Sequence, residues 1–121
     1  MDAIAAIAAL AALAQHTRLE AFRLLVQHEP AGVAAGDLAR RLAVPQNTLS
    51  AHLAILARAG LVQGNRAQRS IIYRAEMGQL RELTLYLLRD CCGGSQELCA
   101  PLIAELTACC PQDNKAKGTC S

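Results

Sequence analysis

Apolar residues recur every three or four positions along most of the first 90 residues, as they do in helices that bury one face. Prolines and glycines interrupt this pattern at Pro30, Gly32, Pro45 and Gly60, and such residues end or separate helices. Helices are therefore predicted within the first 15 residues and over residues 17–28, 36–42, 46–59 and 77–90. The 17–28 helix is expected to bury Leu19, Phe22, Leu25 and Val26, and residues 33–35 are expected to lead into the 36–42 helix. The fold is predicted to be mainly α.

The segment between the last two of these helices has a different pattern. Leu61–Gly64 and Ser70–Arg74 are strand-like runs, and they flank the polar and basic Asn65–Arg69. This arrangement predicts a hairpin with a basic tip. The two helices joined by the tight Ala43–Pro45 connection form a helix-turn-helix. With the hairpin as its wing, the order α-α-α-α-β-β-α is that of a winged helix-turn-helix.

The first predicted helix is rich in alanine and has an apolar stripe of Ile4, Ile7, Ala11 and Ala14. Small residues allow a second helix to approach closely. This stripe, together with the apolar face of the helix over residues 77–90, predicts a helical dimerisation surface and a homodimer. The segment is too short to span a bilayer, and Asp2 stands where a secretory signal carries Lys or Arg. We expect a cytoplasmic protein without a membrane partner.

Charge is segregated along the chain. There are 12 basic and 10 acidic residues in all, but residues 38–75 carry arginines and no acidic side chain. The six arginines of this stretch are Arg40, Arg41, Arg58, Arg66, Arg69 and Arg74. If they are unopposed, they form a surface of one sign that attracts a polyanion.

Polar residues at the start of the 46–59 helix provide the candidate contacts to bases. The first turns of a recognition helix contact base edges in the major groove, and Gln or Asn suits adenine. Double-stranded operator DNA is the expected partner. The candidate DNA-binding residues are Gln46, Asn47, Thr48, Ser50 and His52, with Arg66 and Arg69 of the hairpin on phosphate or in the minor groove.

Several stretches together carry a resemblance to a known family. They are His16–Leu19, Val44–Leu53, Ala59–Val62 and Ser70–Arg74. In these, the chain resembles the ArsR/SmtB family of metal-sensing repressors over roughly residues 8 to 92. The resemblance implies a homodimer that represses an operator and releases it on binding a metal or metalloid. The expected domains are a winged helix-turn-helix domain for DNA binding and dimerisation over 1–92, and a cysteine-rich extension over 93–121.

The chain departs from the family pattern at two positions. Pro45 stands where the family often has serine, and Ala51 where it often has a basic residue. Proline is tolerated at a helix start, but Ala51 lacks a contact to phosphate or base. The operator sequence therefore does not follow from relatives.

Cysteines provide the candidate metal site. Cys91, Cys92 and Cys99 stand where the last predicted helix ends, and Gly93-Gly94 between them allows the chain to reverse. Three thiolates suit a soft ion that needs only three ligands, such as As(III) or Sb(III), whereas structural zinc usually takes four. The family resemblance narrows the sensor to this cluster, because the chain lacks cysteines before the recognition helix and histidines after His52. No cofactor is expected beyond this inducer.

A second cysteine trio, Cys109, Cys110 and Cys120, lies in the polar C-terminal segment. It could form a second metal site, exchange ligands with the first, or serve as a pool of thiols. Two other classes of protein compete with the DNA-binding regulator: a thiol enzyme, such as an arsenate reductase, and a metal-buffering protein. No Cys-x-x-Cys motif precedes a helix in a βαβ unit, so we expect no enzyme. A metal-buffering function would not require a recognition helix or a basic segment, so we consider it less favoured.

Overall fold

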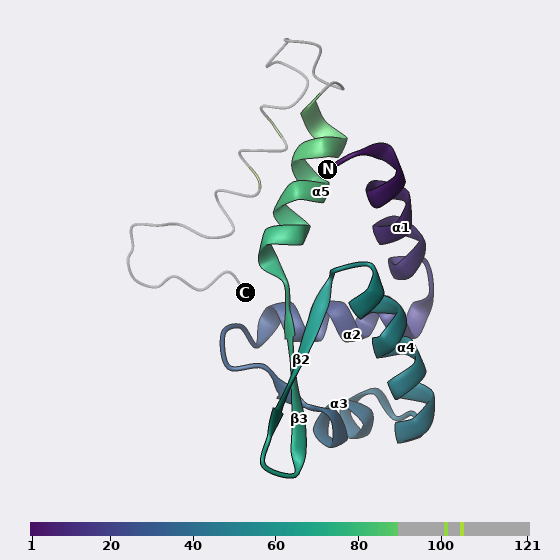
Figure 1. Cartoon of the computed structure of the whole chain (residues 1–121), viewed down its shortest axis with the longest axis vertical. Helices are drawn as coiled ribbons and strands as arrows, with labels where there is room; N and C mark the ends of the chain where they lie inside the picture. The colour runs from purple at the N-terminus through teal and green to yellow at the C-terminus, as the bar shows by residue number, and fades with distance from the viewer. Residues whose placement is uncertain (90–100, 102–104, 106–121) are drawn as a thin grey trace. The chain divides into compact units, whose positions relative to one another are not determined.

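Five helices and a three-stranded antiparallel sheet lie between residues 1 and 89 of the computed structural model, which describes residues 1–89, 101 and 105 (Figure 1). The elements are α1 (Ala3–Leu13), α2 (His16–Gln27), β1 (Val33–Ala34), α3 (Ala35–Leu42), α4 (Gln46–Arg58), β2 (Val62–Ala67), β3 (Ser70–Ala75) and α5 (Met77–Arg89). The chain divides into two compact units, Met1–Thr84 and Leu85–Ser121. The first unit contains every element except the end of α5.

The predicted winged helix-turn-helix is confirmed, with one strand added. Residues 33 and 34 were expected to lead into a helix, but they form β1, which pairs antiparallel with β3 in the order β1-β3-β2. Val33 is opposite Tyr73 and Ala34 is opposite Ile72. A strand of two residues is too short to show an alternating pattern, and its partner lies far along the chain. The sequence therefore carried no local signal for it.

The hairpin is longer than its sequence pattern indicated. Asn65, Arg66 and Ala67 were assigned to a loop, but they continue β2 as far as the pair Ala67–Ser70. Only Gln68 and Arg69 remain in the turn, and Gln68 has a positive φ of 58°. All of β2 after Val62 is exposed, so backbone pairing rather than apolar burial holds this part of the strand. A hydrophobic pattern cannot detect such pairing.

Leucines fill the core of the first unit. Six of them are almost fully buried: Leu25, Leu38, Leu49, Leu53, Leu56 and Leu61. Leu19 was expected on the buried face of α2, but it is 41% exposed. Arg18, the residue before it, lies about 100° away around the helix and is in line with the buried Ala21 and Leu25. Arg18 therefore takes the inward position that the sequence pattern gave to Leu19.

An ion pair joins the segment after α2 to the sheet. Arg74 donates from Nη2 to Oε1 of Glu29 (2.8 Å) and from Nε to Oε2 (3.3 Å), and the Ala75 amide donates to the same Oε2 (3.1 Å). The Glu29 side chain is only 16% exposed. The hydrogen bond from Arg74 lowers the pKa of Glu29, and the charge of Arg74 and the Ala75 amide add to this effect against the opposing effect of burial.

Replacing Glu29 with Gln should make the stability of the protein less sensitive to acid. Because folding lowers the pKa of Glu29 from its ordinary 4.5, the ion pair stabilises the folded state at higher pH. This contribution is lost as the pH falls below 4.5 and through the lowered pKa of the folded state. Melting temperatures of wild type and Glu29→Gln, measured by circular dichroism from pH 7 to pH 3, should converge as the pH falls.

Glu20→Gln is the matched control, because the Glu20 carboxylate makes no ion pair within the described residues. A difference in melting temperature between wild type and Glu29→Gln that stays constant across this pH range would contradict the ion pair.

Candidate nucleic-acid interface

The helix-turn-helix consists of α3 and α4, and the backbone of its turn is closely specified. Ala43 ends α3 in the left-handed region (φ 58°, ψ 44°). Its amide donates to the Arg40 carbonyl (3.2 Å), and the Val44 amide donates to the Ala39 carbonyl (3.1 Å). These two bonds are the Schellman arrangement that closes a helix. Pro45 then has extended geometry and precedes the first turn of α4 without a capping side chain.

The rotation of α4 about its axis decides which side chains face solvent. Leu49, Leu53 and Leu56 are buried at intervals of three and four residues. The polar residues predicted to contact DNA from the start of this helix are exposed: Gln46, Asn47, Thr48 and Ser50. Asn47 accepts a hydrogen bond from the Thr48 amide through Oδ1 (3.0 Å). The first turn contains no acidic residue, and the positive end of the helix dipole favours an anion there.

His52 has a different environment from the other four polar residues. It is half-buried, and its Nδ1 lies 3.3 Å from Nη1 of Arg18. Because a guanidinium can only donate, Nδ1 accepts this bond and the ring proton is on Nε2. Arg18 also donates from Nε to the Ala12 carbonyl near the end of α1 (2.6 Å). His52 is thus linked to α2 and α1 through one arginine.

The expectation of six unopposed arginines is wrong for two of them. Arg74 is paired with Glu29, and Arg40 is paired with Asp37. Both acids precede the acid-free stretch in the sequence, and folding brings them next to its arginines. Arg41 lies 3.3 Å from Nε2 of His28. No ion pair involves the other three within the described part of the chain: Arg58, Arg66 and Arg69.

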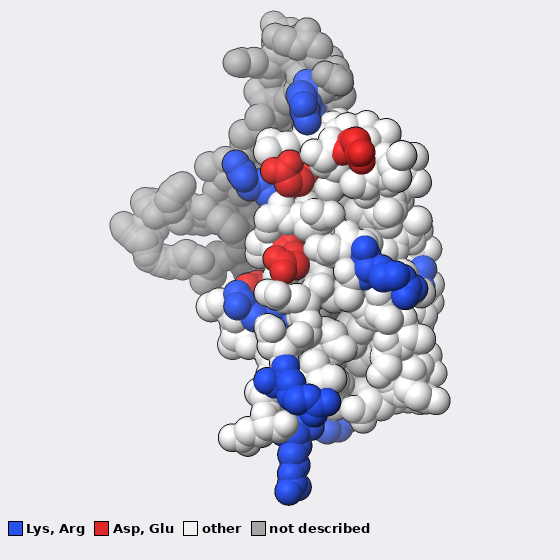
Figure 2. Space-filling view, viewed as in Figure 1, with Lys and Arg blue, Asp and Glu red and all other residues white. Residues whose placement is uncertain are grey.

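The wing lies at the same end of the first unit as the start of α4. In Figure 1, α4 runs upward from the lower end and β2 runs back down, so the first turn of α4 and the hairpin turn share that end. Arg66 and Arg69 are exposed in the outer part of this hairpin. In Figure 2, basic side chains gather over the hairpin, and no acidic side chain is seen near its tip. The exposed polar turn and the basic wing together form a surface suited to DNA.

The other end of α4 is attached to α5. Gly60 follows the helix with φ 79°, and the Leu61 amide donates to the Leu56 carbonyl (3.0 Å). Gln79 of α5 donates from Nε2 to the Ala59 carbonyl (3.0 Å), and the Glu76 amide donates to the Leu61 carbonyl (2.7 Å). A Cβ at position 60 would lie 3.1 Å from Gln79 Nε2. Sequence reasoning did not single out Gln79, although a polar residue beside Leu80 and Leu83 was a usable signal.

The candidate metal ligands cannot be placed. Cys91, Cys92, Cys99, Cys109, Cys110 and Cys120 all lie outside the described residues. Among the residues that are described, no group of three His, Cys, Asp or Glu side chains could hold a metal ion. Within the same residues, no helix is both long enough and apolar enough to cross a membrane.

Comparisons with known proteins agree on one class. A family model described as a helix-turn-helix domain matches residues 13–64. The transcriptional activator HlyU of Vibrio cholerae is 31% identical over 91 residues, which cover 75% of this chain and 82% of HlyU. The structure of an ArsR-like transcriptional regulator from Rhodococcus sp. RHA1 is similar with a TM-score of 0.63 and 30% identity, covering 87% of this chain and 89% of that one.

A third relative is the homodimeric winged helix-turn-helix DNA-binding domain of Mb0332 from Mycobacterium bovis, described as a possible ArsR-family regulator. Its TM-score is 0.59 at 25% identity, over 79% of this chain and 83% of that one. The fold and the exposed start of α4 define a DNA-binding transcriptional regulator. The chain belongs to the ArsR-like family of winged helix-turn-helix regulators. The expectation that it is not an enzyme is confirmed by these relatives.

Replacing Arg66 and Arg69 together with Ala should weaken binding to all DNA sequences alike. Each lost phosphate contact makes the slope of log affinity against log salt about 0.9 less negative, so two contacts change it by roughly 1.8. Fluorescence anisotropy of a labelled duplex at several salt concentrations measures this slope. Arg81→Ala, which removes an exposed arginine of α5, is the control. An unchanged slope in the double variant would remove the wing from the interface.

Proposed function

We propose that this protein is an As(III)- or Sb(III)-responsive repressor. In this proposal it binds operator DNA as a homodimer and dissociates when Cys91, Cys92 and Cys99 bind the metalloid. The observation that carries the DNA-binding part is the exposed polar start of α4 beside the basic wing. The metalloid response rests on the spacing of the cysteines in the sequence.

In the proposed complex, the first turns of α4 enter the major groove. Gln46 and Asn47 are exposed and can each make two hydrogen bonds to an adenine edge. Thr48 and Ser50 can donate to phosphate or base. His52 can donate from Nε2 to a phosphate, because Arg18 already engages its Nδ1. Arg66 and Arg69 contact the backbone or the minor groove.

The homodimer is proposed from exposed aliphatic side chains on α1. Ile4 is 79% exposed, Ile7 is 65% exposed and Leu10 is 42% exposed. A contiguous apolar surface of this kind is characteristic of a protein interface. The buried face of the same helix consists of Ala6, Ala9 and Ala12 instead, so the aliphatic stripe is not needed for the core. The Mb0332 domain is described as homodimeric.

The sensor is proposed at the end of α5. Cys91 and Cys92 follow Arg89, the last described residue of the helix, by two and three positions. Thiolates prefer soft ions, and an ion with a lone pair in place of a fourth ligand suits a trio of cysteines. Cys109, Cys110 and Cys120 remain candidates for a second site.

Contacts within the first unit provide a route from α5 to the recognition helix. Gln79 and Glu76 bind carbonyls at the end of α4 and just after it. A metalloid that shifts α5 would therefore shift α4 and change the spacing of the two recognition helices in a dimer. By linkage, DNA must then weaken metalloid binding by the same factor as the metalloid weakens DNA binding. Near-complete release requires about 5.5 kcal/mol, so both sensors of a dimer are expected to contribute.

A second candidate is activation of transcription rather than repression. The observation that favours it is the relative HlyU, which is named a transcriptional activator. A reporter gene behind the protein's own promoter separates the two, because deletion of a repressor raises expression and deletion of an activator lowers it.

Replacing Ile7 with Glu should convert a dimer into a monomer. The side chain is mostly exposed, so the charge costs the monomer fold little, but it would be buried in the interface. Sedimentation velocity at micromolar concentration measures the change. Gln27→Glu places the same charge on an exposed position of α2 and is the control. A wild-type monomer under these conditions would refute the proposed dimer.

Serine at Cys91, Cys92 or Cys99 should leave DNA binding intact and abolish release by arsenite. Each substitution removes one of three thiolates, whereas the proposed DNA contacts lie elsewhere. Wild type should lose about 5–150-fold in DNA affinity for each arsenite bound, the usual range of such coupling. Anisotropy of a labelled duplex from upstream of the protein's own gene, titrated with arsenite, measures this change.

The triple variant Cys109→Ser, Cys110→Ser, Cys120→Ser is the matched control and should respond as wild type does. If this variant alone loses the response, the sensor is the second trio. If wild type itself does not respond, the protein is not a sensor of arsenite.

A further inference from the structure

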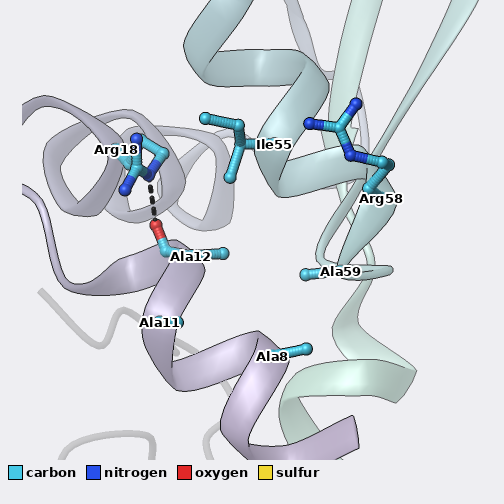
Figure 3. A pocket seen from close by; sticks show the side chains of 7 residues that line it. All are labelled: Ala8, Ala11, Ala12, Arg18, Ile55, Arg58 and Ala59. Atoms are coloured by element: carbon cyan, nitrogen blue, oxygen red, sulfur yellow. Dashed lines mark hydrogen bonds between the residues drawn. The ribbon is translucent and has the colours of Figure 1, made fainter.

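A cavity of about 340 Å³, open to solvent, lies between α1, α2 and α4, away from the start of α4 that is proposed to contact bases (Figure 3). Its volume is at the lower end of the range for small-molecule sites. The lining residues are Ala8, Ala11 and Ala12 of α1, Arg18 of α2, Ile55 and Arg58 of α4, and Ala59 after it.

The lining combines an apolar wall with two positive charges. Five of the seven residues are Ala or Ile, the other two are arginines, and none is acidic. The Arg18 guanidinium donates to the Ala12 carbonyl and to Nδ1 of His52, and both are uncharged acceptors. They fix the guanidinium in place without neutralising it. Arg58 makes no ion pair within the described residues.

Neither of the functions proposed above accounts for Arg58. It follows Gln46 by twelve residues, so it lies about 18 Å along the helix axis from the end proposed to contact bases. Of the stripe predicted for the dimer, only Ala11 lines the cavity, and the exposed aliphatic residues Ile4, Ile7 and Leu10 do not. Figure 3 shows the alanines of α1 on one side of the cavity, and Ile55 and Arg58 of α4 on the other.

We propose that this cavity binds a small organic monoanion, a carboxylate on an apolar body. The carboxylate would lie between Arg18 and Arg58, which can supply charge-assisted hydrogen bonds. The body would contact Ala8, Ala11 and Ile55. An apolar segment from a second copy of the chain is a poorer occupant, because it would bury two guanidinium groups without an acid to pair them.

Hexanoate and hexanol, titrated into the wild-type protein, test this proposal. Amide NMR of labelled protein should show hexanoate shifting the resonances of Ala8, Ala11 and Ile55, with hexanol binding at least tenfold more weakly. From butyrate to hexanoate, each added methylene should tighten binding by about fourfold if it is buried in the cavity. Arg58→Gln should weaken hexanoate binding by about tenfold or more, because it removes a charged partner but keeps a polar side chain of similar reach.

Arg81→Gln, on the exposed surface of α5, is the matched control and should bind hexanoate as wild type does. Equal affinity for hexanoate and hexanol, or an unchanged affinity in Arg58→Gln, would overturn the proposal. Binding to the Ile7→Glu variant but not to wild type would also overturn it, because a second copy would then cover the cavity.

Discussion

The buried leucine stripe of α4 is the constraint on which the DNA-binding surface depends. Leu49, Leu53 and Leu56 fix the rotation of this helix against the rest of the first unit. Once that rotation is set, Asn47 lies on the side of the helix opposite the leucines and Ser50 lies on its flank, so both face solvent. Gln46 is in line with Leu49 and Leu53 but is exposed because it is the first residue of the helix.

The start of α4 is free to contact a ligand, whereas its end is hydrogen-bonded to α5 and the segment before it. The start has no side-chain cap from Pro45, and the Thr48 amide donates to Asn47, so the amides of Gln46 and Asn47 are the ones left to bind an anion. The other end is held by Gln79 on the Ala59 carbonyl and by the Glu76 amide on Leu61. Any movement of α5 must therefore pass to α4 or break these bonds. The proposed anion cavity also contacts this half of α4, through Ile55, Arg58 and Ala59.

The sequence predicted the helices from their periodic apolar pattern, and it predicted the four exposed polar residues of α4 from their place at the start of that helix. It did not predict β1, whose pairing with Tyr73 and Ile72 spans about half of the described chain, or the length of the hairpin. Counting charges within residues 38–75 also missed the pairs Arg74–Glu29 and Arg40–Asp37, since both acids come from outside that stretch. Arg18 was missed because an arginine was not expected at an inward position, although it shares the helical spacing of Ala21 and Leu25.

The most direct test of the central claim is to map the DNA contact on the protein in solution. Amide NMR of the labelled protein, titrated with the duplex from upstream of its own gene, reports which residues change environment. The largest shifts are expected at residues 46–50 and at Arg66 and Arg69, with small shifts at Arg58 and along the start of α5. Shifts concentrated at the end of α4 and on α5, with residues 46–50 unaffected, would contradict it.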